Sequence, residues 1–218
     1  MTMDIPTHLS AADIAKLRLI HAAIRLIAAK GIDGVSLRLV NREAGTKNNS
    51  SLHYHFGDKA GLVEASIHYI QDWFEENREA QLKALETKAK AGRITVAEVM
   101  DVLIDPYVTL LETESWGQDA LCALARFEFD GDDEIHQVLN DSAGKVARRM
   151  RKLLNIACPD LTRKQINQRL NMCLFIVLQG FANSKNQHQT YMGDLSRSYK
   201  AMGAEFKQFC VSGIGNHS

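Results

Sequence analysis

The chain has 218 residues with 26 basic and 26 acidic side chains, so its formal net charge is zero. Hydrophobic residues make up 45% of it and charged residues 24%, which excludes both a disordered chain and a uniformly basic nucleic-acid coat. It has only three prolines and no apolar stretch near the roughly 20 residues that span a bilayer, so we expect an all-α protein rather than an all-β or membrane protein. The N-terminus lacks a signal-peptide pattern, which predicts a cytoplasmic location.

Three helices are expected in the first sixty residues. Ser10 and Asp13 have the spacing of a helix-capping pair, and apolar residues three and four apart continue from there on one face until Gly31 ends the helix. A second helix is expected over 36–45 and a third over 51–56. The second helix, with about nine residues, is too short to be stable alone in water, so it must pack on the first.

The second and third helices, joined by a polar turn, have the pattern of a helix-turn-helix. In the third helix Leu52 and Phe56 share one face, and small polar and aromatic side chains point away from it. Such a helix can enter the major groove of double-stranded DNA, where hydroxyl, imidazole and phenol groups reach base edges or phosphates. The residues that we assign to DNA on this basis are Ser50, Ser51, His53 and Tyr54, with Asn49 in the preceding turn and Lys47 and Lys59 on the phosphates.

The charge distribution agrees with this assignment. Residues 1–60 hold eight basic and five acidic side chains, whereas the rest of the chain holds 18 basic and 21 acidic ones. A mildly basic head suits contact with a polyanion, although many solvated surfaces differ by as much. We therefore expect a DNA-binding domain over residues 1–60 and a second helical domain over residues 61–218.

The rest of the chain reads as further helices separated by short breaks. In chain order, we expect a helix over 59–90, a helix capped by Thr95 and Glu98 that Pro106 kinks or breaks, a helix that begins at Ser115 and Gln118, a helix after the acidic cluster 130–134, a helix capped by Thr162 and Gln165, and a last helix over 191–211.

Residues 12–66 resemble the DNA-binding head of the TetR family of transcriptional regulators. The matching features are a helix that ends in Lys30 and Gly31, the short VSLRLVNREAG helix, and the closing LHYHFGDK-GL. The turn before LHYHF is longer by one residue than the family's usual turn, and its aromatic and histidine residues stand in exchanged order. The resemblance implies that DNA is contacted by Ser51, His53, Tyr54 and His55 and that Lys59 contacts phosphate.

The resemblance also implies a helical-bundle body that binds a small-molecule effector and forms a homodimer. Two heads a helical turn apart would read a pseudo-palindromic operator, most often as a repressor that the unknown effector releases. Near the helix breaks, where cavities tend to open, the candidate effector-binding residues are Trp116, Arg126 and Phe127. Arg126 lies in an apolar run and could meet an acidic ligand, but a salt bridge to Glu128 or another carboxylate explains it as well. On the last two helices, the candidate dimer-interface residues are Phe175, Leu178, Phe181, Tyr199, Met202 and Phe206.

No metal site and no cofactor are expected. His53 and His55 diverge on a helix, and the acidic cluster 130–134 lacks the spacing of a calcium loop. The four cysteines are too scattered for a zinc site, so we expect reduced, mostly buried thiols. Hydrolase, nucleotide-binding and metalloprotease motifs are absent from the sequence. The alternatives that stay open are a helical ligand-binding protein without DNA binding, and an enzyme whose site is assembled from distant residues.

Overall fold

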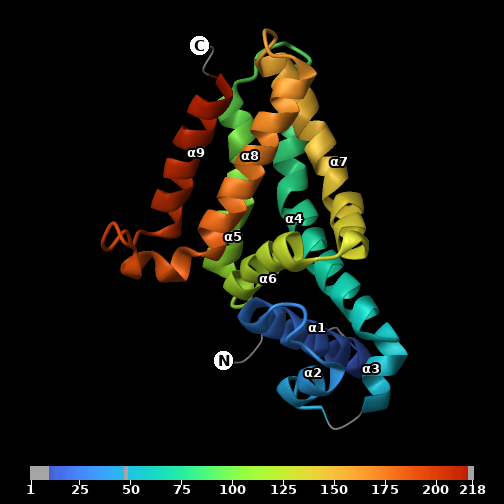
Figure 1. Ribbon diagram of the computed structural model, residues 1–218. Helices are drawn as coiled ribbons and strands as arrows, with labels where there is room; N and C mark the ends of the chain where they lie inside the picture. The colour runs from blue at the N-terminus through green and yellow to red at the C-terminus, as the bar shows by residue number, and fades with distance from the viewer. Residues whose placement is uncertain (1–9, 47–48, 216–218) are drawn as a thin grey trace. The chain divides into compact units, whose positions relative to one another are not determined.

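The computed structural model of the protein describes residues 10–46 and 49–215, with the side chains of residues 49–51 left out. Within these ranges every regular element is a helix, which confirms the predicted all-α class (Figure 1). In chain order the elements are α1 (Ala11–Lys30), α2 (Leu37–Glu43), α3 (Asn49–Phe56), α4 (Lys59–Ala89), α5 (Val96–Thr113), α6 (Gly117–Asp130), α7 (Asp133–Ala157), α8 (Arg163–Ala182), the 3-10 helix η1 (Ser184–Gln189) and α9 (Tyr199–Gly215).

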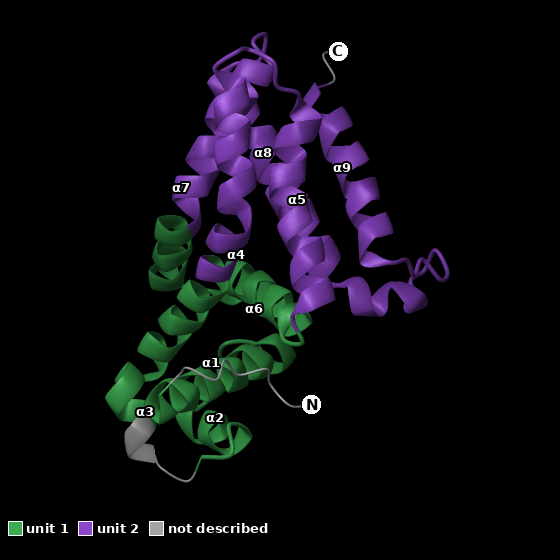
Figure 2. Cartoon of the chain, turned by 180° about the vertical axis from the view of Figure 1, so that it is seen from behind, with its two compact units in different colours: residues 1–71, 115–142 green, residues 72–114, 143–218 purple. Residues whose placement is uncertain are grey.

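The helices group into two compact units (Figure 2). The first unit holds residues 1–71 and 115–142, and the second holds residues 72–114 and 143–218. This division differs from the single boundary at residue 60 that we expected from the sequence. It differs because α6, from the middle of the chain, packs along α1, and because α4 continues without a break past residue 60.

In the first unit, α1 begins and ends at the residues that the sequence indicates. The Ser10 hydroxyl accepts a hydrogen bond from the Asp13 amide at 3.1 Å, and the Asp13 carboxylate accepts one from the Ser10 amide. Gly31 ends the helix with a φ of 72°, a left-handed conformation that side chains disfavour. The face that includes Leu19 and Ile24 is fully buried, and α1 packs against α2, α3 and α6.

In the second unit, α9 packs along α5 and α8. A row of aromatic rings crosses this unit, one each from α4, α5, α8 and α9. Successive ring centroids are 4.9 Å, 5.7 Å and 5.2 Å apart, in the order Phe74, Tyr107, Phe181 and Phe206. Aromatic pairs at these separations add to the stability of a core beyond the area that they bury.

Of the predicted kink or break at Pro106, the break does not occur, because helix α5 runs through this residue from Val96 to Thr113. Proline has no amide hydrogen to donate to the carbonyl four residues earlier, which here belongs to Val102. That carbonyl instead accepts a hydrogen bond from Nε of Arg78 on α4, at 3.0 Å. The replacement donor leaves no unsatisfied buried carbonyl at this point, and the helix continues.

Two other helix starts differ from the prediction. The capping pairs at Thr95 and Thr162 are confirmed, but α6 begins after Trp116 with no side-chain cap, not at Ser115. The last helix begins at Tyr199 rather than at residue 191. Residues 190–193 instead form a turn, in which Gly193 has a φ of 92°, and residues 194–198 form an irregular segment, in which the Asp194 carboxylate accepts from the Ser196 amide.

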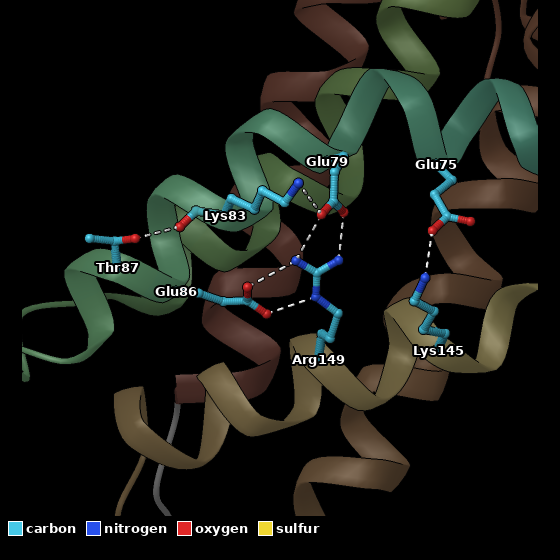
Figure 3. Close-up of polar contacts among 7 residues, drawn as sticks. All are labelled: Glu75, Glu79, Lys83, Glu86, Thr87, Lys145 and Arg149. Atoms are coloured by element: carbon cyan, nitrogen blue, oxygen red, sulfur yellow. Dashed lines mark hydrogen bonds and ion pairs between the residues drawn. The ribbon is translucent and has the colours of Figure 1, made fainter.

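A cluster of charged side chains connects α4 with α7 in the second unit (Figure 3). The Arg149 guanidinium contacts the Glu86 carboxylate at 2.7 and 2.9 Å and reaches the Glu79 carboxylate at 2.6 Å. Its side chain is only 18% exposed, and it holds the pKa of both glutamates below the usual range by hydrogen bonding. A more exposed pair, Lys145 with Glu75 at 2.9 Å, lies beside it.

Candidate nucleic-acid interface

Helix α3 has one buried side and one exposed side. The Leu52 side chain is fully buried, whereas Tyr54, two residues later, is 86% exposed. Two residues along an α-helix correspond to a rotation of about 200°, so these side chains point in nearly opposite directions. The predicted division of this helix between core and surface is confirmed at these two positions.

The end of α3 is fixed by a short run of hydrogen bonds. Gly57 follows the helix with a φ of 74°, and its amide donates to the His53 carbonyl at 2.9 Å. The Asp58 carboxylate then accepts from the Gly61 amide at 2.9 Å, which makes Asp58 the N-cap of α4. The sharp turn places Lys59, half-buried, in the first position of α4, directly after α3.

The His53 ring is oriented by the same turn. Its Nδ1 lies 2.7 Å from the Gly57 carbonyl oxygen, and because a carbonyl can only accept, Nδ1 carries the hydrogen and donates. The other ring nitrogen, Nε2, can therefore accept a hydrogen bond when the ring is neutral or donate one when it is protonated. His55 lies next to Tyr54, with ring centroids 5.2 Å apart in an edge-to-face arrangement.

The two helices before α3 are held together by polar contacts at their ends. Arg25 on α1 pairs with Glu43 on α2 at 3.2 Å. Beyond α2, Thr46 donates from its amide and its hydroxyl to the buried Asn41, both at 3.0 Å. These contacts fix the beginning of the turn that leads to α3.

The structure describes the side chains of only some of the predicted DNA-binding residues. Lys47 lies outside the described residues. Asn49, Ser50 and Ser51 belong to α3, but their side chains lie outside what the structure describes. The side chains of His53 and Tyr54 are exposed, and those of His55 and Lys59 are half-buried. The assignment of these residues to DNA contact stays a prediction.

The three predicted effector-binding residues differ in how far their side chains are exposed. Phe127 is fully buried, and Trp116 is 9% exposed. Arg126 has a side chain that is 47% exposed and pairs with Asp130, four residues later, at 3.5 Å. Arg126 thus forms the salt bridge to a carboxylate that the sequence analysis gave as the alternative to ligand binding, although its partner is Asp130 rather than Glu128.

Trp116 packs in a cluster with His21 and Tyr69, which together join α1, α4 and the start of α6. The His21 ring centroid lies 5.4 Å from Trp116 and 5.1 Å from Tyr69. Burial lowers the pKa of His21 to about 4, with a smaller contribution from the charge of Arg25. This cluster belongs to the core of the first unit.

A cavity of about 270 Å³ lies in the second unit, where η1 and the turn before α9 meet the end of α5. None of the three predicted effector-binding residues lines it. Its charged lining residues include Arg197, which pairs with Glu205 at 3.0 Å, and Glu112, which pairs with Lys200 at 3.5 Å.

The six predicted dimer-interface residues fall into three classes. Phe175 is 53% exposed, and Tyr199 and Phe206 are half-buried. Leu178, Phe181 and Met202 are buried inside their own unit. Two further apolar side chains that the sequence analysis did not single out, Met172 on α8 and Phe209 on α9, are each 62% exposed.

One buried charge was missed altogether. The buried positions of α4 follow a helical period through Phe74, Leu82 and Leu85, and Arg78 occupies the same stripe with only 8% of its surface exposed. An arginine at an apolar register position is a signal that the sequence alone contains, because long charged residues are rarely buried without a reason.

Residues 10–46 and 49–215 hold no group of three histidine, cysteine or acidic side chains placed to bind a metal ion. No helix in the described ranges has the length and hydropathy of a membrane span. Three of the four cysteines are buried and Cys122 is half-buried, which confirms the prediction of mostly buried thiols.

Comparison with known proteins identifies the family. The family model for "Bacterial regulatory proteins, tetR family" matches residues 19–66, and the one for "Tetracyclin repressor-like, C-terminal domain" matches residues 101–213. The chain is 34% identical over 82 residues to the HTH-type transcriptional regulator BetI of Vibrio atlanticus, covering 38% of this chain and 40% of BetI. It is 30% identical over 108 residues to BetI of Burkholderia mallei, covering 49% of this chain and 55% of BetI. The chain thus spans about half or less of the length of these curated relatives.

Solved structures share the fold over nearly the whole chain. The transcriptional regulator FadR from Bacillus subtilis superposes with a TM-score of 0.67 at 15% identity, over 90% of this chain and 98% of FadR. FadR from Bacillus halodurans gives a TM-score of 0.65 at 14% identity, over 93% and 97% of the two chains. Because the C-terminal family model alone covers more than half of the chain and the N-terminal one covers the helix-turn-helix, this protein belongs to the TetR family of bacterial regulatory proteins.

Proposed function

We propose that the protein is a dimeric, sequence-specific DNA-binding transcriptional regulator, acting in the cytoplasm as a repressor that a small-molecule effector releases from its operator. Residues 1–60 would bind DNA, and residues 61–218 would bind the effector and form the homodimer. The observation that carries DNA binding is the outward face of α3, where Tyr54 is 86% exposed opposite the buried Leu52. An exposed face on a short helix fits the major groove.

The chemistry of this face suits both kinds of DNA contact. The Tyr54 hydroxyl can donate to or accept from a base edge, and Nε2 of His53 is left available because Nδ1 is bound to Gly57. Lys59 can pair with a phosphate at the start of α4. The remaining members of the predicted set are Lys47, Asn49, Ser50, Ser51 and His55.

The homodimer is proposed from exposed apolar side chains on the last two helices. Met172, Phe175 and Phe209 are all more than half exposed, which is unusual for large apolar residues in the absence of a partner. Two heads are also needed to read a pseudo-palindromic operator, since one short helix offers few base contacts.

The effector is proposed from the fold. FadR from Bacillus subtilis, which shares this fold, is described in complex with stearoyl-CoA, and this supports a body that takes an organic effector. An effector that prefers the conformation with lower operator affinity would release the repressor in proportion to that preference.

A gel-shift assay with the DNA that flanks the protein's own gene tests DNA binding. We expect Tyr54→Ala to weaken binding of a specific fragment at least tenfold, whereas Tyr191→Ala, which removes a fully exposed tyrosine from the turn at residues 190–193, leaves it unchanged. Because Tyr54 is exposed, its removal should not affect folding. A wild-type protein that binds no such fragment would favour the alternative, a helical ligand-binding protein without DNA binding. Equal binding by wild type and Tyr54→Ala would refute the role of α3.

A further inference from the structure

The His53 ring is held in one tautomer at the end of α3. Its Nδ1 lies 2.7 Å from the Gly57 carbonyl oxygen, which can only accept, so Nδ1 carries the hydrogen. In the opposite direction, the Gly57 amide donates to the His53 carbonyl at 2.9 Å. The ring cannot turn over without losing the bond from Nδ1. In the neutral ring the other nitrogen, Nε2, therefore has a lone pair and can only accept.

This acceptor lies on the exposed side of α3. Leu52 is fully buried and Tyr54 is 86% exposed, and His53, which lies about 100° from each around the helix, is exposed as well. Because Nδ1 faces Gly57, Nε2 lies on the far edge of the ring. Within residues 10–46 and 49–215, no side chain or backbone group is hydrogen-bonded to Nε2. The acceptor is thus open to a donor from outside the chain.

Few groups of double-stranded DNA can donate to such an acceptor in the major groove. Phosphate oxygens only accept, and so do N7 and O6 of guanine and O4 of thymine. The amino groups of adenine N6 and cytosine N4 donate. A neutral His53 can therefore pair with a base that carries an amino group, whereas a keto oxygen or a phosphate would place two lone pairs against each other.

The neighbouring side chains do not make this distinction. The Tyr54 hydroxyl can both donate and accept, so it tolerates amino and keto bases alike. Lys59 only donates, which suits phosphate. His53 supplies an acceptor that works in one direction only, and a group of this kind separates the four bases into two classes.

We propose that His53 is a specificity-determining residue that selects adenine or cytosine over guanine or thymine at one position in each half of the operator. The inference rests on the proposed function, because it assumes that α3 enters the major groove of an operator. A single hydrogen bond that the wrong base replaces with two opposed acceptors predicts a preference of about fivefold.

The variant His53→Asn separates base reading from a structural role. The amide nitrogen of asparagine takes the place of Nδ1 and can still donate to Gly57, but nothing takes the place of Nε2. Operators would be selected from a random DNA library and sequenced, at about pH 8.5, where histidine exposed to water is neutral. We expect wild type to favour adenine or cytosine at one position that becomes indifferent in His53→Asn, with the other positions unchanged.

Two further variants complete the selection. In His53→Gln the side-chain amide reaches the place of Nε2 and can present either its oxygen or its nitrogen, so amino and keto bases should be accepted to within about twofold of each other. This variant decides the matter if His53→Asn does not fold. His188→Asn makes the same change at an exposed histidine of η1 and should select the wild-type operator.

A chemically altered operator tests the contact itself. Purine in place of adenine, or 2-pyrimidinone in place of cytosine, removes only the amino group at the selected position. Binding by wild type should weaken about fivefold more than binding by His53→Asn or His53→Gln, because only wild type depends on an acceptor fixed at that point. Equal weakening in wild type and variants would overturn the proposal.

The selection also distinguishes failure of this inference from failure of the proposed function. If wild type enriches no sequence at all, the proposed function falls and the role of His53 falls with it. If wild type enriches an operator that His53→Asn or His53→Gln selects identically, or if the position that changes favours guanine or thymine, the regulator stands and only the role of His53 is refuted.

Discussion

The His21 imidazole on α1 lies 2.9 Å from the hydroxyl of Tyr69 on α4. Both rings also pack against Trp116, which stands directly before α6. One hydrogen bond and two ring contacts of His21 thus join α1, the helix that supports α2 and α3, to α4 and to the residue that stands directly before α6. The neutral form of His21 is the one that this environment favours, because burial lowers its pKa to about 4.

His21 should make the protein less stable in acid. An unfolded chain has a histidine pKa near 6.5, so between about pH 6.5 and 4 the unfolded state binds a proton that the folded state does not. The contribution of His21 to stability is therefore complete above about pH 6.5 and is lost as the pH falls toward 4. Allowing for the partial exposure of the ring, we expect about 1–2 kcal/mol of unfolding free energy to be lost between pH 7.5 and pH 5.

Urea unfolding of wild type and His21→Phe at both pH values measures this contribution. The variant should lose less stability on acidification, by about the 1–2 kcal/mol that His21 accounts for. Tyr69→Phe keeps the buried ring and should retain the wild-type pH dependence. Identical pH dependence in wild type and His21→Phe would mean that His21 is not the titrating group.

Lys59 should contribute to DNA affinity through phosphate. Each lysine that neutralises a phosphate releases counterions, so Lys59→Ala should lower the slope of log affinity against log salt by about one for each protomer. Binding should weaken for specific and random DNA alike. Lys164→Ala, at an exposed lysine at the start of α8, is the matched control and should leave the slope unchanged. A slope that both variants share with wild type would exclude the phosphate contact.

The charge cluster at Arg149 should stabilise the second unit more than an ordinary surface ion pair does. Arg149→Met leaves Glu79 and Glu86 without their shared partner, and we expect a loss of about 1–2 kcal/mol of unfolding free energy at pH 7. Lys145→Met removes a more exposed pair and should change the unfolding free energy by less than about 0.5 kcal/mol. Chemical unfolding of the two variants side by side gives the comparison.

The same cluster predicts a pH effect with a defined direction. Because Arg149 holds the pKa of both glutamates below the usual value of 4.5, its stabilising effect is present above that value and is lost as the pH falls through the folded-state pKa. The stability difference between wild type and Arg149→Met should therefore shrink in acid. A difference that stays constant from pH 7 to pH 3 would show that packing, not charge, accounts for it.

Phe175 should contribute to the homodimer. Phe175→Glu places a charge among the exposed apolar side chains of α8, where a partner chain would have to desolvate it, and we expect the dimer dissociation constant to rise at least tenfold. Phe129→Glu makes the same change at another exposed phenylalanine, on α6, and should not affect association. Sedimentation velocity over a range of concentrations distinguishes the two. A Phe175→Glu protein that stays as dimeric as wild type would remove α8 from the interface.

The sequence predicts well where local chemistry decides the structure. The capping pairs at Ser10, Thr95 and Thr162 each begin a helix as expected, because the cap and its partner lie within one turn. The opposed directions of Leu52 and Tyr54 also follow from helical period alone. The core and surface sides of α3 could therefore be assigned at these positions without coordinates.

What the sequence did not predict depends on contacts between distant residues. Helix α5 continues past Pro106 because Arg78, from another helix, supplies the missing donor, and no local rule contains that partner. The ion pair of Arg126 was anticipated in kind, but its partner, Asp130, became clear only from the structure. The start of α9 at Tyr199 was missed because Leu195 continues the helical period of apolar residues into the irregular segment 194–198 before the helix.

The bond between Arg78 and the Val102 carbonyl also ties two positions together in evolution. A descendant with another residue in place of Pro106 would regain a backbone amide that can donate to the Val102 carbonyl. Position 78 would then no longer have to supply a hydrogen-bond donor. A descendant that lost Arg78 first would have a buried Val102 carbonyl without a hydrogen-bond donor in the middle of a helix. We therefore expect substitutions at the two sites to have occurred in a preferred order, with the proline changing before the arginine in lineages that have lost both.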